Sequence, residues 1–238
     1  IGTSGVLFAH SDSIALDPQG RLHTFCHAVP GRYHLMAVTL SAGGSLRWLR
    51  DTFGFSQSYD ELTALAATVP PGCEGLLFLP YLTGERTPHL DPLARGAFVG
   101  LTARHTAAHL IRAVMEGVVF SLRDGLEIMR GLGVPLEQIR ATGGGGRSPL
   151  WRQMQADIYG AQVVTLAAEE GPAYGAALLA GVGAGIFANV NAAVDQCVSV
   201  TGRTQPNAGN QTQYEDGYAI YRQLYGHLRD DLHQLAAV

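Results

Sequence analysis

The chain has 238 residues, of which 47% are hydrophobic and 15% charged, and its formal net charge is −4. This composition excludes a disordered chain and argues against binding to nucleic acid or to an anionic membrane surface. No apolar run is long enough to span a membrane, and no signal-peptide pattern is present. Cys26, Cys73 and Cys197 form no CxxC or zinc pattern, which indicates a reducing, cytoplasmic setting.

Two absences narrow the chemistry further. The sequence contains no lysine, so every basic residue other than histidine is arginine. A Walker A loop requires lysine, as do Schiff-base and pyridoxal phosphate catalysis, so these classes are excluded. The chain also lacks an initiator methionine and opens on Ile1-Gly2-Thr3-Ser4-Gly5, which we interpret as a cut inside a larger protein.

The first part of the chain is predicted to be rich in strands and then helical. Short apolar or alternating runs, divided by turn sequences at 17–20 and 30–31, predict strands at 6–9, 22–27 and 33–38. Helices are predicted to follow at about 41–52 and 59–68.

The remainder is predicted to alternate between strands and helices. Apolar residues recur at every fourth position from Leu110 to Leu126 and predict the longest helix. The expected elements are a strand at 76–79, a polar loop at 80–96, a strand at 98–99, a helix at 106–130, a strand at 138–142, a helix at 150–157, a strand at 162–166, a helix at 173–187, a loop at 189–210 and a helix at 214–235. This alternation predicts a layered α/β fold.

Four consecutive glycines, Gly143 to Gly146, stand between the strand at 138–142 and the helix at 150–157. Ser148 is interpreted as the N-cap of that helix and Pro149 as its first residue. A glycine run here leaves backbone N–H groups open at the positive end of a helix, which suits an anion or a flat ring. The alternative is a flexible turn without a ligand.

Two other glycine segments are candidate ligand loops. Gly2-Thr3-Ser4-Gly5 places a hydroxyl group beside glycines in a turn, where it can meet a phosphate oxygen. Gly43 and Gly44 open a predicted helix, and Arg47 lies one turn along on the same face as Gly43. Tight helix packing beside a solvated arginine would explain this second segment equally well.

The polar loop and a histidine pair carry weaker signals. Glu85 and Arg86 either line a cleft or brace the loop, and the sequence does not choose between these roles. His105 and His109 have the i, i+4 spacing of zinc ligands, but no glutamate of a metalloprotease motif lies between them and no third ligand is evident. We therefore predict no metal site in this chain.

Taken together, the segments resemble the C-terminal half of the FGGY carbohydrate kinases. Gly96-Ala97-Phe98-Val99-Gly100-Leu101, followed by His109-Leu110 and Ala113-Val114-Met115-Glu116, is similar to the long family signature at every position. The run from Leu79 to His89 is most similar to the xylulokinase members, and the glycine run with Arg147, Ser148 and Trp151 resembles the adenosine-binding segment of the family. Gly146 stands where alanine is more usual.

The resemblance implies an actin/hexokinase/Hsp70-like (ribonuclease H-like) α/β lobe, with a mixed sheet flanked by helices. Residues 1–238 would form the C-terminal nucleotide-binding lobe, and the N-terminal sugar-binding lobe would lie outside this chain. ATP and Mg²⁺ are the implied cofactors. Gly2 and Thr3 would lie at the terminal phosphates, Gly43 and Arg47 beside the nucleotide, and Gly144, Gly145 and Ser148 around the adenosine.

The implied reaction is transfer of the γ-phosphate of ATP to a sugar hydroxyl, most closely D-xylulose to D-xylulose 5-phosphate. The catalytic aspartate of the family would lie upstream of Ile1, so we expect the chain alone to bind nucleotide weakly and to phosphorylate no sugar. The alternatives are a kinase for another sugar or polyol, and a non-catalytic actin-like nucleotide-binding module. A homodimer through the helices at 106–130 and 214–235 is a further expectation.

Overall fold

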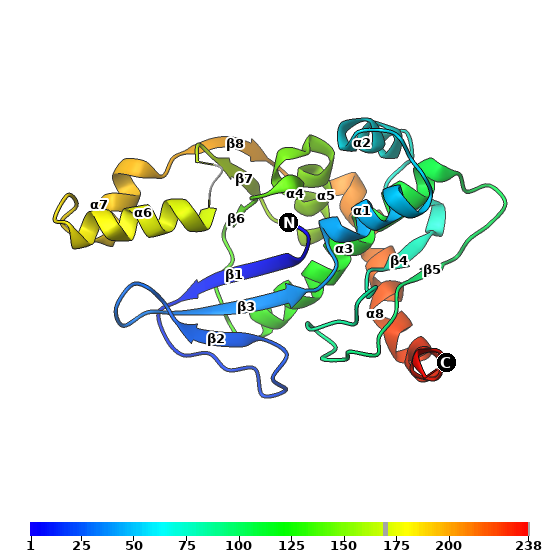
Figure 1. The fold of residues 1–238 in the computed structure, drawn as a ribbon, viewed down its shortest axis with the longest axis horizontal. Helices are drawn as coiled ribbons and strands as arrows, with labels where there is room; N and C mark the ends of the chain where they lie inside the picture. Colours follow the sequence, from blue (N-terminus) through cyan, green and yellow to red (C-terminus); the bar gives the residue numbers. More distant parts are fainter. Residues whose placement is uncertain (169–170, 238) are drawn as a thin grey trace.

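Helix α3 (Ala107–Gly131) is the element around which the rest of the chain packs. The computed structural model describes residues 1–168 and 171–237, and Figure 1 shows its arrangement. Helix α3 contacts β1, β3, β4, α1, α2, α5 and α8, and every residue from Ile111 to Leu126 is buried. Because so much of α3 is enclosed within its own chain, this stretch has little surface to offer a second copy.

The first sheet is antiparallel, with the order β1-β3-β2. Its strands are β1 (Gly5–Ser11), β2 (His23–Cys26) and β3 (Tyr33–Thr39). Ala9 pairs with Leu35 and Leu7 with Ala37, and these side chains join Met129 of α3 in a small core cluster. Alternation along the strands sends Phe8 to the opposite, exposed face. One face of this sheet is therefore fixed against α3.

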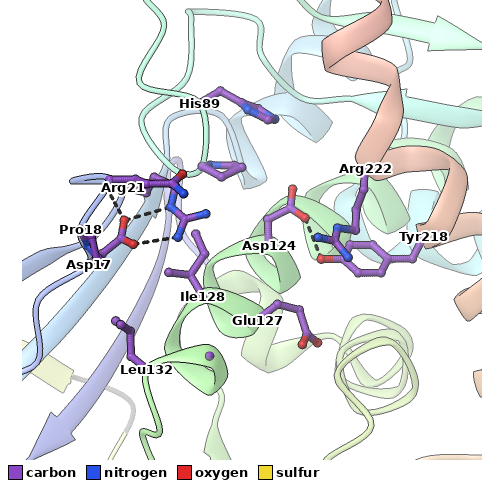
Figure 2. A pocket seen from close by; sticks show the side chains of 13 residues that line it. Asp17, Pro18, Arg21, His89, Asp124, Glu127, Ile128, Leu132, Tyr218 and Arg222 are labelled. Atoms are coloured by element: carbon purple, nitrogen blue, oxygen red, sulfur yellow. Dashed lines mark hydrogen bonds and ion pairs between the residues drawn. The ribbon is translucent and has the colours of Figure 1, made fainter.

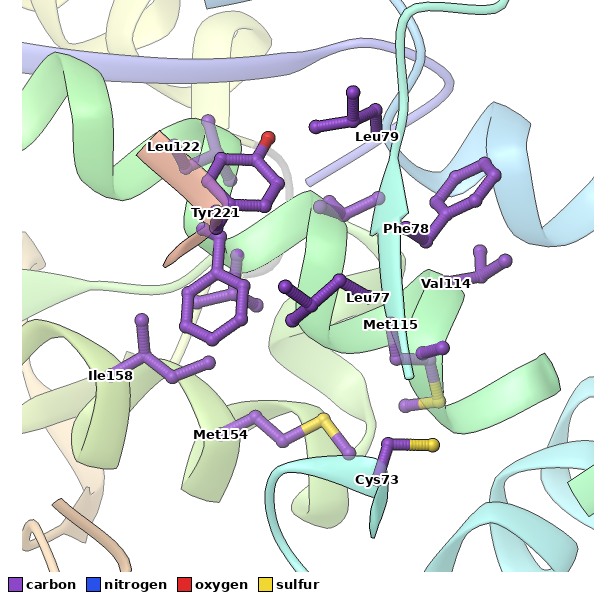
Figure 3. Packing of buried hydrophobic residues seen from close by; sticks show 14 of the residues in the cluster. Cys73, Leu77, Phe78, Leu79, Val114, Met115, Leu122, Met154, Ile158 and Tyr221 are labelled. Atoms are coloured by element: carbon purple, nitrogen blue, oxygen red, sulfur yellow. The ribbon is translucent and has the colours of Figure 1, made fainter. Parts of the chain in front are cut away.

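The segment after β3 supplies the centre of the main core. It contains α1 (Gly43–Thr52), α2 (Tyr59–Ala67), the 3₁₀ turn η1 (Cys73–Gly75), β4 (Leu77–Leu79) and β5 (Ala97–Val99). Leu77, Phe78 and Leu79 lie among side chains of α3, α5 and α8, as Figure 3 shows. Strand β4 is thus buried on both faces, which explains why its sequence is a continuous apolar run rather than an alternating one.

The second half of the chain forms a mixed sheet and the closing helix. Strand β6 runs parallel to β7, and β7 runs antiparallel to β8. The elements are β6 (Ile139–Arg140), α4 (Gly144–Arg147), α5 (Pro149–Tyr159), β7 (Val163–Leu166), α6 (Gly171–Gly183), α7 (Val190–Cys197), β8 (Val200–Thr204) and α8 (Ala208–Ala236). Helix α8 packs against α5, α3 and β4, and α6 and α7 project from one end of the molecule (Figure 1).

The predicted loop at 189–210 is wrong, because this segment contains α7, β8 and the start of α8. Asn189 caps α7 by accepting a hydrogen bond from the N–H of Ala192, and Asn207 caps α8 in the same way. The asparagines that suggested a loop are helix N-caps. Helix α6 is also shifted relative to the predicted 173–187, since it begins at Gly171 and ends at Gly183.

A buried network of charges links four segments of the main core. The guanidinium of Arg112 donates to Glu116 at 2.6 Å, to the Val69 carbonyl at 2.7 Å and to the Tyr214 hydroxyl at 2.9 Å. Tyr214 donates to the same Glu116 oxygen at 2.9 Å, and so does the N–H of Gly72 at 3.2 Å. The other Glu116 oxygen is buried without a partner among the described residues. The network joins α2, η1 and α8 to α3.

Candidate functional site

The opening loop of the chain is bonded directly to the N-terminus of α1. The N–H of Gly43 donates to the Gly2 carbonyl at 2.8 Å, and the N–H groups of Ala42 and Gly44 donate to the Thr3 carbonyl at 2.8 and 2.9 Å. Two of the three predicted ligand segments therefore form one continuous backbone surface. Gly2 and Thr3 remain exposed on it.

The glycine run lies against the other side of the opening loop. The N–H of Gly145 donates to the Ile1 carbonyl at 3.2 Å, and the amino group of Ile1 donates to the Thr142 carbonyl at 3.0 Å. Residues separated by 141 positions are thus joined through backbone groups. All three glycine segments meet around residues 1–3.

Most of these glycines are required by close backbone contacts. A Cβ at Gly43 would lie 2.5 Å from the Gly2 carbonyl oxygen, and one at Gly143 would lie 2.7 Å from that of Ile1. Gly143 also has a φ of +70°, which disfavours other residues. Two glycines are different: the nearest atom to an added Cβ lies 3.9 Å away at Gly144 and 3.7 Å away at Gly2. These two exposed positions leave space into which a ligand can fit.

The glycine run is a helical turn rather than the open loop that its composition suggests. It forms α4, and Ser148 then caps α5 by accepting a hydrogen bond from the N–H of Trp151, with Pro149 as the first residue of α5. Arg152 donates to the carbonyls of Gly146 and Arg147 at 2.7 and 2.8 Å. Arg152 therefore ties the end of α4 to α5.

Side chains of α5 hold the α4 turn in place through hydrogen bonds to its carbonyl groups. Besides Arg152, the amide of Gln155 donates to the Gly145 carbonyl at 3.0 Å. Sequence analysis did not assign a role to Arg152 or Gln155. The available signal was their position in the first turns of the helix that follows the glycine run, because helical side chains lean back toward the N-terminus.

A hollow of about 430 Å³ opens beside the glycine run. It lies between the turn and the mixed sheet of β6, β7 and β8, and its polar lining consists of Thr142, Arg147, Arg152, Thr165 and Thr201. Hydroxyl groups, guanidinium groups and glycine backbone therefore surround it. Such a set can donate hydrogen bonds to an uncharged heterocycle, a ribose or an anion.

The other predicted site residues differ in exposure and in their distance from the opening loop. Gly145 is buried and its N–H is already donated to Ile1, while Ser148 is half-buried and serves as the N-cap of α5. Arg47 is exposed on α1. None of the seven predicted residues is among those that line the hollow beside the glycine run, which is bordered by Gly143 and Gly146 instead. The structure thus brings Gly2, Thr3, Gly43, Gly144 and Gly145 together, with Ser148 adjacent and Arg47 further along α1.

Comparison with known protein families shows which family the chain belongs to. The model for the C-terminal domain of the FGGY family of carbohydrate kinases matches residues 1–184. The chain belongs to the FGGY family. A xylulose kinase of Staphylococcus epidermidis is 44% identical over 225 residues, which cover 94% of this chain and 45% of that protein. A gluconokinase of Bacillus subtilis is 36% identical over 248 residues, covering 99% of this chain and 48% of that protein.

Solved structures of FGGY kinases share the fold of this chain. A ligand-bound xylulose kinase from Lactobacillus acidophilus superposes with a TM-score of 0.91 at 29% identity, covering 99% of this chain and 48% of the other. For a xylulose kinase from Rhodospirillum rubrum the TM-score is 0.86 at 32% identity, covering 98% and 47%. The fold is therefore the actin/hexokinase-like type that the resemblance implied. The chain spans about half the length of the relatives it matches.

The polar loop of this FGGY chain braces the fold behind the ligand segments. Glu85 is buried and accepts hydrogen bonds from the Thr39 hydroxyl at 2.6 Å, from the N–H of Leu40 at 3.0 Å and from the N–H of Arg86 at 2.7 Å. These bonds fix the end of β3 just before α1 begins. For Glu85 the structure favours the bracing role.

Both histidines near the start of α3 make local hydrogen bonds, His109 in the helix cap and His105 in the turn before it. His105 accepts a hydrogen bond from the N–H of Thr102, and His109 accepts one from the N–H of Thr106. Among residues 1–168 and 171–237, no group of three histidine, cysteine, aspartate or glutamate side chains is arranged to hold a metal ion. Within the same residues, no helix is both long enough and apolar enough to cross a membrane.

Glu85→Gln is expected to flatten the pH dependence of stability. Burial raises the pKa of Glu85 from 4.5 to about 7. The native state therefore binds this proton more tightly than the unfolded chain, so the free energy of unfolding falls as the pH rises from 4.5 to about 7. The loss is about 3 kcal/mol. Urea unfolding at the two ends of this range measures it, and a variant that keeps the full slope would contradict this assignment.

Proposed function

We propose that this chain is the ATP-binding half of a carbohydrate kinase that transfers the γ-phosphate of ATP to a sugar hydroxyl. The observation that carries the proposal is the meeting of three glycine segments around residues 1–3, with Gly2 and Gly144 left exposed and unobstructed. Backbone surfaces of this kind let a nucleotide approach closely. ATP supplies the phosphoryl group, and Mg²⁺ enters with it.

Each predicted residue has a role in this proposal. Thr3 offers its hydroxyl to the terminal phosphates, and Gly2 allows them to approach. Gly144 lies beneath the adenosine, and Gly145 and Ser148 hold the turn that supports it. Gly43 and Arg47 lie on the α1 side of the nucleotide. The sugar and the base that deprotonates its hydroxyl are assigned to parts of the enzyme beyond this chain, and the chain alone is expected to phosphorylate no sugar.

For the substrate we propose D-xylulose, giving D-xylulose 5-phosphate. The support comes from relatives, because xylulose kinases of Staphylococcus epidermidis and Lactococcus lactis are both 44% identical to the chain. The gluconokinase at 36% identity defines the rival substrate class. A coupled assay of the full-length enzyme with D-xylulose and with gluconate decides between the two substrates. A higher kcat/KM for gluconate would overturn the assignment of D-xylulose as the substrate.

Calorimetric titration with Mg·ADP and then with Mg·GDP tests the nucleotide site itself. We expect saturable binding of ADP with a dissociation constant of about 1 mM, and weaker binding of GDP. If ADP binding is absent both from this chain and from the full-length enzyme, the assignment of the glycine segments is wrong. Binding by the full-length enzyme alone would show that the site needs the rest of the protein to assemble.

Thr3→Ala is expected to weaken ATP binding about tenfold and to leave adenosine binding nearly unchanged. The reason is that a hydroxyl bonded to a charged phosphate contributes more than one bonded to a neutral group. Titration of the variant with both ligands measures the difference. Ser4→Ala is the matched control, because Ser4 is a neighbouring exposed hydroxyl residue that we have not placed at the phosphates. Equal losses for ATP and adenosine would remove Thr3 from the phosphates.

A further inference from the structure

A second and larger hollow, of about 620 Å³, lies on another part of the molecule. It is formed by the loop after β1, the turn at Pro88–His89, one face of α3 and one turn of α8, as Figure 2 shows. It shares no lining residue with the hollow beside the glycine run. The proposed nucleotide site therefore does not account for it.

Two of the acidic groups in this hollow are already neutralised by arginines. The Asp17 carboxylate accepts two hydrogen bonds from the Arg21 guanidinium, at 2.9 and 2.7 Å, and its side chain is completely buried. This pairing lowers the pKa of Asp17 to about 2. Glu127 pairs with Arg123 at 3.3 Å and with Arg130 at 2.7 Å. Neither carboxylate needs a ligand to balance its charge.

Asp124 and Arg222 are the ionisable groups that keep hydrogen-bonding capacity toward the hollow. One Asp124 oxygen accepts a hydrogen bond from the Tyr218 hydroxyl at 2.7 Å, and the other has no partner among the described residues. The Arg222 guanidinium lies 5.7 Å from the centre of the Tyr218 ring, on the same side of the hollow. Burial raises the pKa of Asp124 to about 7, so at neutral pH this carboxyl is only partly ionised and can donate as well as accept a hydrogen bond.

His89 adds a neutral donor and acceptor. Its ring stacks on Tyr225 at a centroid distance of 3.8 Å and meets the edge of Tyr81 at 5.6 Å. Burial lowers the pKa of His89 to about 4, so the imidazole is uncharged at neutral pH. Neither ring nitrogen has a hydrogen-bond partner within the described part of the chain. A neutral imidazole has one donor nitrogen and one acceptor nitrogen.

Apart from the polar side chain of Gln19, the rest of the lining is apolar. Pro18, Pro88, Ile128 and Leu132 border the hollow, and Ile128 lies one helical turn from Asp124 on the same face of α3 (Figure 2). A ligand that satisfies this lining needs several neutral donors and acceptors together with C–H surface. Sugars and polyols have this combination.

We propose that this hollow is a binding site for a neutral polyhydroxylated molecule, a sugar or polyol, separate from the nucleotide site. Asp124 accepts from one hydroxyl of the ligand and Arg222 donates to another. His89 both donates and accepts, and the C–H face of the ligand lies on Ile128 and Leu132. A volume of about 620 Å³ suits a molecule of this class.

Saturation-transfer NMR with xylitol as the probe tests the site on this chain. We expect saturable binding in the millimolar range, weakened about tenfold by His89→Phe and by Arg222→Gln, since each variant removes about one hydrogen bond. His89→Phe keeps the ring that stacks on Tyr225. Because Arg222 is exposed, we expect the Arg222→Gln variant to fold normally. This variant can therefore test the site even if the His89→Phe variant does not fold.

Arg229→Gln is the matched control, because Arg229 is an exposed arginine of the same helix that pairs with Asp230 outside the hollow. It is expected to bind xylitol as the unsubstituted chain does, and Mg·ADP is expected not to compete. Three results would overturn the proposal: no saturable binding of xylitol, binding that neither His89→Phe nor Arg222→Gln weakens, or equal binding of inorganic phosphate. Because the readout is xylitol rather than nucleotide, failure here is distinguishable from failure of the kinase assignment.

Discussion

Arg112→Met is expected to lower the free energy of unfolding by about 3–5 kcal/mol, the largest effect that we predict for a single substitution. The substitution leaves Glu116 as a buried carboxylate without its cation, and it removes the hydrogen bonds that Arg112 donates to Val69 and Tyr214. The loss corresponds to a fall of roughly 10 °C in the melting temperature. Urea unfolding followed by circular dichroism measures it.

The double variant Arg112→Met/Glu116→Leu distinguishes two causes of lost stability: the loss of the ion pair itself, and the burial of a Glu116 carboxylate that has no cation beside it. Removing both charges also removes the Glu116 oxygen that has no partner, so we expect the double variant to be more stable than Arg112→Met alone. Arg104→Met is the control, because Arg104 makes an exposed ion pair with Glu74 and should cost less than about 1 kcal/mol. An Arg112 variant as stable as this control would refute the role of the network.

Gly144→Val is expected to weaken ADP binding at least a hundredfold, about 2.7 kcal/mol, with little change in stability. At this position an added Cβ meets only the Ile1 carbonyl oxygen, at 3.9 Å, so the branched side chain extends into the space assigned to adenosine. Calorimetric titration with Mg·ADP and a thermal melt measure the two quantities. The combination of lost binding and an intact fold is the critical result.

Two glycine variants serve as references for Gly144→Val. Gly175→Val lies in α6, where an added Cβ meets nothing within 4 Å, and it should leave ADP binding unchanged. Gly145→Val places a Cβ 2.6 Å from the Ile1 side chain, so it should displace the opening loop and reduce stability as well as binding. If Gly144→Val binds ADP as tightly as Gly175→Val does, the adenosine does not lie over Gly144.

Local signals in the sequence predicted most of the fold. Strand β4 was predicted from an unbroken apolar run, the core of α3 from a four-residue repeat, and the start of α5 from Ser148 followed by Pro149. These features depend on residues within one or two turns of each other. The segment at 189–210 was misread because asparagine is common both in loops and at helix N-caps, and the pairing of β8 with β7 is a long-range contact.

The site was predicted in pieces rather than as a whole. Each glycine segment was recognisable alone, but their meeting depends on backbone bonds such as the one between Ile1 and Thr142, and only the family resemblance joined them beforehand. Glu85 illustrates the remaining limit. Its type and its loop were compatible with two roles, and the choice required the partners Thr39 and Leu40, which are more than forty positions away.

Glycines fixed by backbone contacts and glycines that border open space should be substituted at different rates among homologous proteins. Gly43 and Gly143 are fixed by the backbone of the opening loop, so they should persist even in a lineage that has lost the ability to use nucleotide. Gly2 and Gly144 are free of such contacts, so under the proposed nucleotide site selection on them comes from the ligand alone. In a lineage with a degenerate kinase, substitutions at Gly2 and Gly144 should therefore accumulate first.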